Sequence, residues 1–359
     1  SMAENDVLYV LTTPEFFTEG PCGRVGHAIG FMAGVVASGK GLTLLSGPGA
    51  EDFMDEPETV SFRLIRRGLS WWPRLLLSAM REVSRHRVVV VRWRPVLPFL
   101  LLPLLLLNRR FWFEVNSLTG LDSANPLARV LVRLSVWLTT RFFNVITVSE
   151  ASMDRIRGLS KPCRTTHVMP NGFQPRWLAE FEPRSVPDVA PSLVYFGRKQ
   201  PYYDWEMLYN SARQLIDEGV IAGVALFGFE EPSPHSSIKA HGEFDPGSLV
   251  RDLSAIPNPI LIVHSSGSDM ARATSPVKLF EYAALALPVV ASCSMRRQAS
   301  RLPAFRFYGA GCEQQFSSAV RDIASDYPLA LQQAEESRRI ALDHYTWHAV
   351  VRAWLSDAL

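Results

Sequence analysis

Residues 275–292 read SPVKLFEYAALALPVVAS, a helix-like pattern that leads directly into an apolar run. The first part, residues 276–285, has the spacing of an amphipathic helix, and residues 288–291 have the composition of a buried strand. A helix followed at once by a buried strand is typical of an α/β fold with a parallel sheet. Lys278 and Glu281 lie three residues apart on one face of this helix, in a chain that has only five lysines.

The same alternation of helical patterns and apolar runs extends over most of the chain. Four consecutive valines at 88–91 are apolar on both faces, as expected for a strand between two helical layers. A stretch at 175–191 is rich in proline and acidic residues and interrupts the alternation. A chain of 359 residues is also long enough for two domains of about 150 residues each.

We therefore predict an α/β protein with two doubly wound, Rossmann-like domains that face each other across a cleft. The expected parts are an N-terminal domain at 2–174, a linker at 175–191, a C-terminal domain at 192–340 and a helix at 341–359 that crosses back to the N-terminal domain. In such sheets ligands bind beyond the carboxyl ends of the strands, so polar residues at these ends are candidates for a functional site.

The net charge of +2 gives no general argument for a nucleic-acid partner. Locally, residues 63–110 contain eleven arginines and a single acid, Glu82, together with Trp71, Trp72 and Trp93. Such a pattern is typical of a surface that meets anionic lipid or nucleic acid. The four cysteines are widely separated and match no C-x-x-C metal pattern, so we expect free thiols in a reducing cytosol.

Residues 88–107 have nearly the length of a membrane span, but they contain Arg92, Arg94 and three prolines. Their uncharged part, residues 95–107, has 13 residues, whereas a span requires roughly 20. We interpret this segment as a strand at 88–93 followed by a short buried helix.

The start of the helix at 276–285 has the features of a phosphate site. Ser275 is a good N-cap and Pro276 suits the first helical position, so free backbone N–H groups would point outward. Lys278 adds a full positive charge, and Glu281 would accept hydrogen bonds from ribose hydroxyls. The alternative is an ordinary surface Lys–Glu pair, which contributes a few tenths of a kcal/mol.

The stretch 275–292 resembles the nucleotide-sugar signature of GT-B glycosyltransferases, most of all that of the retaining family four of bacterial polysaccharide and glycoconjugate synthesis. Other pieces resemble that family in the same order along the chain. They are Gly23, Gly26 and His27 after the first strand, Glu114 and Asn116 at a strand end, Met169-Pro170-Asn171-Gly172, Gly197 and Arg198 after the first strand of the second series, Gly242 and Phe244, and Tyr345-Thr346-Trp347.

The resemblance implies a hexosyltransferase that moves a sugar from a nucleotide-diphosphate donor to a glycan or lipid-linked acceptor with retention, in bacterial surface polysaccharide or glycoconjugate synthesis. It assigns the donor nucleotide to Gly197, Arg198, Phe244, Ser275, Pro276, Lys278 and Glu281. Catalytic roles fall to Arg198, Lys278, Glu114 and Asn116, and the acceptor or sugar loop to Gly23, Gly26 and His27.

No cofactor or metal is expected, because Arg198, Lys278 and the helix dipole would neutralise the diphosphate of the nucleotide sugar. The expected partners are the nucleotide sugar, the acceptor and the inner leaflet of the membrane, reached through segment 63–110, with no nucleic acid. The protein would be cytoplasmic, peripheral at the inner membrane face.

Two positions depart from the family pattern. Where the family often has an acid, this chain has Ala273, and where it often has a lysine, this chain has Asp204. A catalytically inactive scaffold that binds nucleotide or glycan therefore stays open, as does a nucleotide-sugar epimerase of the same fold. Residue by residue, simpler roles also stay open: Arg198 as a solvated loop residue, His27 as a structural residue, Phe244 as a core residue, and Glu114 and Asn116 as strand caps.

Overall fold

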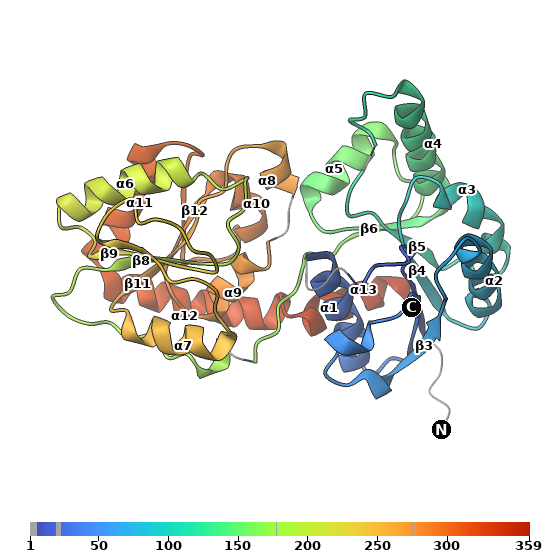
Figure 1. Cartoon of the computed structure of the whole chain (residues 1–359), viewed down its shortest axis with the longest axis horizontal. Coiled ribbons are helices and arrows are strands. Elements are labelled where there is room, and N and C mark those ends of the chain that lie inside the picture. Colours follow the sequence, from blue (N-terminus) through green and yellow to red (C-terminus); the bar gives the residue numbers. More distant parts are fainter. Residues whose placement is uncertain (1–5, 19–22, 119, 177, 274–275) are drawn as a thin grey trace. The chain divides into compact units, whose positions relative to one another are not determined.

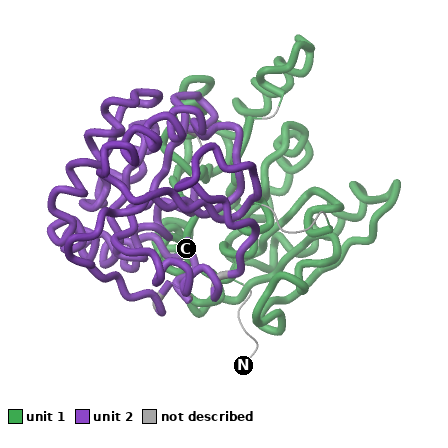
Figure 2. The backbone as a smooth tube through the Cα atoms, turned by 60° about the vertical axis from the view of Figure 1, so that its left-hand side comes forward, with its two compact units in different colours: residues 1–172, 347–359 green, residues 173–346 purple. Residues whose placement is uncertain are grey.

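The structure is a computed structural model that describes residues 6–18, 23–118, 120–176, 178–273 and 276–359. The chain divides into two compact units. Unit 1 consists of Ser1–Gly172 and Trp347–Leu359, and unit 2 of Phe173–Thr346 (Figure 2). Each unit is a parallel sheet with helices on both faces (Figure 1). The predicted fold class, an α/β protein of two doubly wound, Rossmann-like units, is confirmed.

Unit 1 is built on a seven-stranded sheet with the order β3-β2-β1-β4-β5-β6-β7, in which all neighbouring strands are parallel. The strands are β1 (Val7–Val10), β2 (Leu42–Ser46), β3 (Val60–Leu64), β4 (Val88–Arg92), β5 (Phe111–Glu114), β6 (Asn144–Thr147) and β7 (Thr166–Val168). Val7 and Tyr9 of β1 belong to one buried cluster, and Leu8 and Val10 belong to another. Both faces of the strand are apolar because helices cover both.

One face of this sheet is covered by α1 (Gly23–Ala37) and α13 (Trp347–Ala358). The other face is covered by α2 (Trp71–Val83), α3 (Leu97–Leu101), η3 (Leu102–Leu106), α4 (Pro126–Phe142) and α5 (Glu150–Leu159). Two short turns, η1 (Glu51–Phe53) and η2 (Pro57–Thr59), precede β3. Figure 1 shows α2, α3, α4 and α5 following one another along this layer.

Helix α13 packs closely against α1 because α1 presents glycines at the contact. A Cβ atom on Gly34 would lie 2.6 Å from the carbonyl oxygen of Trp347, and one on Gly30 would overlap the Trp347 ring. The end of the chain is thus part of unit 1. The helix begins at Trp347, however, and residues 341–346, which we expected in it, belong to unit 2.

Unit 2 is built on a six-stranded parallel sheet with the order β10-β9-β8-β11-β12-β13. Its strands are β8 (Ser192–Phe196), β9 (Gly223–Phe227), β10 (Ile238–Ala240), β11 (Pro259–Val263), β12 (Val289–Ser292) and β13 (Phe305–Tyr308). Its helices are η4 (Leu178–Glu180), α6 (Trp205–Asp217), α7 (Pro246–Ala255), α8 (Asp269–Ala273), α9 (Lys278–Ala284), η5 (Cys293–Met295), α10 (Arg296–Ala299), α11 (Glu313–Ser325) and α12 (Tyr327–His344). A single buried apolar cluster extends through the unit.

The segment 175–191, expected as a linker, lies within unit 2. Leu178 and Phe181 are buried in the core of that unit. The side chain of Asn258 accepts a hydrogen bond from the Val186 backbone at 2.7 Å and donates to the carbonyls of Val186 and Val189 at 2.8 Å each. The segment is therefore part of unit 2, although it is rich in prolines and acids. Leu178, Phe181 and the buried amide of Asn258 hold it in place.

The segment 88–107 forms β4, α3 and η3, as a strand followed by short helical turns. The expectation that these turns are buried holds for one side only: Leu97, Leu101 and Leu104 are buried, whereas Phe99 and Leu106 are exposed. Among the residues that the structure describes, none of the helices has both the length and the apolar character needed to cross a bilayer.

Candidate functional site

Unit 2 has a pocket of about 380 Å³ beyond the carboxyl end of β8. Its wall is formed by the end of β8 and the loop that follows, by Phe244, and by the residues that open α9. The lining residues are Tyr195, Phe196, Gly197, Arg198, Gln200, Tyr202, Tyr203, Phe244, Pro276, Val277, Lys278 and Glu281. Six of the seven residues expected to hold the donor nucleotide therefore surround one cavity, and the seventh, Ser275, lies outside the described residues.

Lys278 reaches across to the end of β8. Its Nζ donates a hydrogen bond to the Phe196 carbonyl oxygen at 2.6 Å and lies 4.2 Å from the centroid of the Tyr195 ring. Burial lowers the pKa of Lys278 to about 8, although the nearby Glu281 carboxylate acts in the opposite direction. Lys278 is therefore a cation held in a pocket wall, and the alternative of a surface Lys–Glu pair does not describe it.

Glu281 lies one helical turn after Lys278 and also lines the pocket. Burial raises the pKa of Glu281, while the Lys278 ammonium lowers it. The wall of the pocket thus contains one cation and one carboxylate, each of which is only partly exposed. A ligand that offers both an anion and hydroxyl donors is suited to this pair.

The loop after β8 depends on Gly197. Its φ of +136° lies in a region that side chains rarely adopt, and a Cβ atom there would overlap Lys278 Nζ. Its amide donates to the Phe227 carbonyl at 2.9 Å, and the next carbonyl, that of Arg198, accepts from the Tyr195 hydroxyl at 2.6 Å. Glycine is thus required here, and the loop that it forms places the exposed Arg198 beside the same cavity as Lys278.

The start of α9 differs from the expected phosphate site. The helix begins at Lys278 with Val277 at the N-cap position, two residues later than predicted. The amides of Leu279 and Phe280 donate to the carbonyls of Pro276 and Val277 at 3.2 and 3.0 Å, and so are not available to an anion. Positive charge in the pocket therefore comes chiefly from side chains.

Aromatic rings form the wall behind Lys278, and sequence reasoning did not assign them. The Tyr195 and Tyr203 rings surround His264, which follows β11 and is fully buried. Burial, together with the Lys278 charge, lowers the pKa of His264 to about 3, so this ring is neutral. The Phe244 ring makes an edge contact with the Phe196 ring, with 6.0 Å between their centroids, and is partly exposed at the cavity. It therefore packs on the core and also lines the pocket.

A second polar cluster lies in unit 1, at the carboxyl ends of β1, β4 and β5. Glu114 is its centre and is only 1% exposed. Its carboxylate accepts hydrogen bonds from the Tyr9 hydroxyl at 3.2 Å and from the Asn116 amide at 2.8 Å, and lies 3.5 Å from Arg92 Nη1. His27 Nε2 lies 3.2 Å from this carboxylate.

These contacts determine the charge of Glu114. Burial alone would raise the pKa of this carboxyl, but His27, Arg92 and the Asn116 amide together lower it to about 2. The Glu114 side chain has no exposed surface. Glu114 thus orients its neighbours, and the half-buried Asn116 donates a hydrogen bond to it. The catalytic role expected for both residues stays a prediction.

His27 is held from both sides. Its Nδ1 forms a short hydrogen bond with Asn171 Oδ1, and the ring makes an edge contact with Trp347 at 5.3 Å. Both partners occur in pieces that carried the resemblance, but neither had been assigned to the site. Tyr9 was also missed, because a tyrosine inside an apolar strand carries no signal of a polar partner.

Gly23 and Gly26, expected in the acceptor or sugar loop, lie in the first turn of α1 and are exposed. A Cβ atom on either would have no neighbour within 4 Å, and neither needs a left-handed backbone. Neither close packing nor backbone conformation therefore requires glycine at positions 23 and 26. Gly30 and Gly34, by contrast, are required by the close contact with α13.

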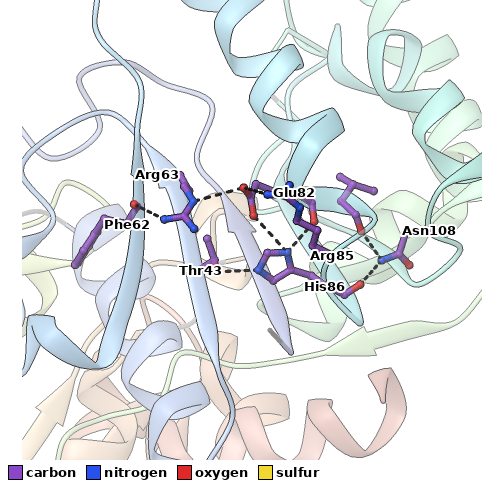
Figure 3. A network of polar contacts seen from close by, with 8 residues as sticks. Thr43, Phe62, Arg63, Glu82, Arg85, His86 and Asn108 are labelled. Atoms are coloured by element: carbon purple, nitrogen blue, oxygen red, sulfur yellow. Dashed lines mark hydrogen bonds and ion pairs between the residues drawn. The ribbon is translucent and has the colours of Figure 1, made fainter. Parts of the chain in front are cut away.

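The arginine-rich segment 63–110 is less available than its composition suggests. Glu82 Oε1 lies 3.4 Å from both Arg63 Nε and Arg85 Nη1, and His86 bonds to the Glu82 carbonyl at 2.7 Å and to Thr43 Oγ1 at 2.8 Å (Figure 3). Burial lowers the pKa of His86. These residues thus form a structural network that ties α2 to the edge of the sheet.

The tryptophans of this segment correct our expectation further. Trp71 and Trp93 are buried, and their indole N–H groups donate to the Thr12 carbonyl at 3.2 Å and to Thr139 Oγ1 at 3.0 Å. Both belong to the core beneath α2, α3 and α4. They are therefore not the aromatic side chains of a membrane-facing surface.

No group of three His, Cys, Asp or Glu side chains arranged to hold a metal ion occurs in the described part of the chain. Cys163, Cys293 and Cys312 are free thiols.

Neither a protein-family model nor a curated protein matches this chain. Solved structures do. Sucrose-phosphate synthase from Thermosynechococcus elongatus matches with a TM-score of 0.66 and 13% identity over 98% of both chains. HepE from Anabaena in complex with UDP matches with a TM-score of 0.70 and 13% identity over 98% of this chain and 99% of the other.

A glycosyltransferase from Rickettsia africae matches with a TM-score of 0.70 and 12% identity over 99% of this chain and 98% of the other. The chain has the GT-B fold. At these identities the similarity establishes the fold, and the function has to be argued from the residues of the pocket.

Proposed function

We propose that the chain is a hexosyltransferase-type glycosyltransferase that uses a nucleotide-diphosphate sugar as donor. The observation that supports this most directly is the pocket in unit 2, where Lys278, Glu281 and Arg198 surround one cavity beyond a strand end. In α/β sheets this is the position at which nucleotides bind. HepE, which has the same fold, was solved with UDP and with UDP-glucose.

The pocket suits a diphosphate because two basic side chains, Lys278 and Arg198, line it. We propose that Lys278 and Arg198 bind the diphosphate, and that Glu281 accepts hydrogen bonds from the ribose. As the glycosidic bond breaks, negative charge accumulates on the departing diphosphate, and a fixed cation stabilises it. No metal is needed in this proposal.

We propose that the acceptor, a glycan or a lipid-linked glycan, is served by unit 1 through Gly23, Gly26 and His27, with Glu114 and Asn116 as positioning residues. The Glu114 carboxylate holds His27 in one orientation. Retention of configuration and a role in bacterial surface polysaccharide or glycoconjugate synthesis, at the inner face of the membrane, complete the proposal and rest on the family resemblance.

Isothermal titration calorimetry with UDP, UDP-glucose and the corresponding guanosine compounds tests donor binding. Lys278→Met keeps most of the side-chain volume and removes the charge, so we expect a loss of about tenfold to a hundredfold in affinity, because hydrogen bonds to charged groups contribute about 1.5–3 kcal/mol. Lys239→Met, at an exposed lysine of β10, is the matched control. Equal affinity in both variants, with unchanged thermal stability, would remove the support for this site.

A scaffold that binds nucleotide without turnover is the second candidate, because of Asp204. Its carboxylate caps α6 by accepting from the Met207 amide at 3.1 Å, where the family often has a lysine. Asp204 thus stabilises a helix and adds no positive charge. Release of free sugar from the donor, measured by chromatography, separates the candidates, since only an enzyme hydrolyses or transfers it.

A further inference from the structure

The outer surface of α3, η3 and α4 exposes apolar side chains to an unusual degree. On α4, Leu127 is 77% exposed, and Leu134 and Trp137 are each 50% exposed. On the neighbouring turns, Phe99 is 40% and Leu106 is 90% exposed. Because α3 packs against α4, these residues belong to adjoining helices of one layer (Figure 1). Exposed apolar side chains that gather on adjoining helices mark an interaction site.

Helix α4 carries apolar side chains on its outer side as well as on its inner side. Its packing in unit 1 explains only those on the inner side. Its inner side, including Val132 and Val136, is buried against the sheet, and Ser135, Thr139 and Thr140 accompany them there. Its outer side carries the large apolar residues that a solvent-facing helix would replace with polar ones. Large apolar side chains on the outer side of a helix are normally covered by another surface.

The charges on this surface have one sign. Helix α4 contains three arginines and no acid, and both Arg129 and Arg133 are exposed. Arg109 and Arg110, which follow η3, are exposed as well. Between Glu82 and Asp122 the sequence contains a single acid, Glu114, which is buried. Among the described residues, no ion pair engages Arg129 or Arg133, in contrast to the arginines around Glu82.

We propose that this surface, the outer side of α3, η3 and α4, docks on an anionic lipid bilayer. Leucines and a tryptophan that enter the headgroup boundary, with arginines at the level of the phosphates, are the features of interfacial helices. A second copy of the chain fits less well, because a symmetric dimer would bring two acid-free arginine surfaces together. Docking on the bilayer would also bring the enzyme close to a lipid-linked acceptor. This last argument rests on the proposed function, and the others do not.

Co-sedimentation with vesicles tests the proposal. We expect the chain to bind vesicles that contain phosphatidylglycerol and to release them at high salt, with weak binding to pure phosphatidylcholine. Arg129→Gln/Arg133→Gln should lower partitioning about thirtyfold, since each basic residue near the surface contributes about 1 kcal/mol. Leu127→Ser/Leu134→Ser/Trp137→Ser should lower it at least tenfold, because it removes the inserting side chains.

The matched control is Leu329→Ser/Leu342→Ser/Arg251→Gln, which alters two exposed leucines and one exposed arginine of unit 2 and should bind like the wild type. Circular dichroism and thermal melting verify that each variant folds. The affinity for UDP-glucose, titrated without vesicles, should be equal in all variants. If the chain does not bind UDP-glucose, the proposed donor site is wrong, but the vesicle result still tests the docking surface.

Three results would overturn the proposal: a wild-type chain that ignores anionic vesicles at low salt, α4 variants that bind as tightly as the control, or light scattering that shows a dimer which the leucine and tryptophan changes convert to a monomer. The last result would assign the surface to a second copy of the chain.

Discussion

The polar cluster around Glu114 in unit 1 stabilises the charge at its centre, whereas the pocket of unit 2 disfavours the charge of Lys278. In unit 1, Glu114 is buried with polar neighbours, of which His27, Arg92 and Asn116 lower the pKa of its carboxyl to about 2. In unit 2, burial disfavours the charge of Lys278 and lowers its pKa to about 8, and the ammonium donates a hydrogen bond to the Phe196 carbonyl. The carboxylate at the centre of the first cluster already has polar partners, whereas the cation of the second would gain stability when an anion enters.

This difference assigns different tasks to the two clusters. A carboxylate that is already satisfied fixes the orientation of its neighbours and has little to gain from a ligand. A partly desolvated ammonium at a cavity gains from every anionic oxygen that approaches it. Unit 1 therefore holds His27 in a frame of polar contacts, and in the proposed function unit 2 supplies the electrostatic attraction for a diphosphate.

The largest effect is expected from Glu114→Ala. Removal of the carboxylate leaves His27, Arg92 and the Tyr9 hydroxyl without their buried partner, and such a loss costs about 3–5 kcal/mol in the free energy of unfolding. Urea unfolding followed by tryptophan fluorescence measures it. Glu58→Ala, at an exposed acid of unit 1, should cost little. A similar small cost for both variants would contradict the view of Glu114 as the centre of a completed cluster.

Acid should weaken unit 1 through the same residue. The pKa of Glu114 is about 2 in the folded chain against an ordinary 4.5, so the folded state binds this proton less readily than the unfolded state. Its stabilisation, about 3 kcal/mol, is fully present above pH 4.5 and is lost as the pH falls towards 2.

Urea midpoints between pH 6 and pH 3 measure this loss. The variant Glu114→Gln cannot titrate at this position, so its stability should fall less steeply with acid than that of the wild type. Parallel slopes for the two proteins would show that other carboxyl groups account for the acid sensitivity.

High pH should change both the stability and the ligand affinity of unit 2 through deprotonation of Lys278. Because its pKa is lowered to about 8, the contribution of Lys278 to the stability of the unliganded chain increases as the pH rises from 8 towards 10.5, where the unfolded lysine loses its own proton. UDP affinity should do the opposite and fall by up to about tenfold per pH unit above 8, since the neutral amine no longer attracts the diphosphate.

Calorimetry at pH 7, 8 and 9 compares the wild type with Lys278→Arg, whose guanidinium stays charged over this range. The arginine variant should bind UDP with an affinity that does not depend on pH. An equally steep decline in the variant would assign the titration to another group.

The sequence predicted the pocket of unit 2 better than the cluster of unit 1. Residues that follow parallel strands gather at one edge of a sheet, so a correct order of strands and helices brings Gly197, Lys278 and Glu281 together. Burial depends on contacts between segments far apart in the chain. Nothing in the local pattern distinguishes the buried Glu114 from an exposed strand cap, or the buried Trp71 from a surface aromatic residue.

The elements that were not predicted are edge strands and one long helix, α12, whose buried side consists largely of small residues such as Ala330, Ala334 and Ala341. The edge strand β3 carries exposed residues such as Arg63 and lacks the apolar run of an interior strand, and the short edge strand β10 contains the exposed Lys239. The segment 175–191 was interpreted as a linker because its two apolar anchors, Leu178 and Phe181, are too few to produce a periodicity. Central strands and amphipathic helices were the predictable part.

The smallest effect is expected from Gly26→Ala, and it tests whether the first turn of α1 serves a ligand. A Cβ atom at Gly26 meets nothing within 4 Å, so the alanine should stabilise the helix by about 0.5–1 kcal/mol. Gly158→Ala in α5 has equally open surroundings and should give the same gain, which makes it the matched control. If a substrate approaches the backbone at Gly26, only that variant should lose transfer activity while it gains stability. Full activity in both would leave Gly26 an ordinary helix residue, and unit 1 would then contribute to the reaction through His27 and its neighbours alone.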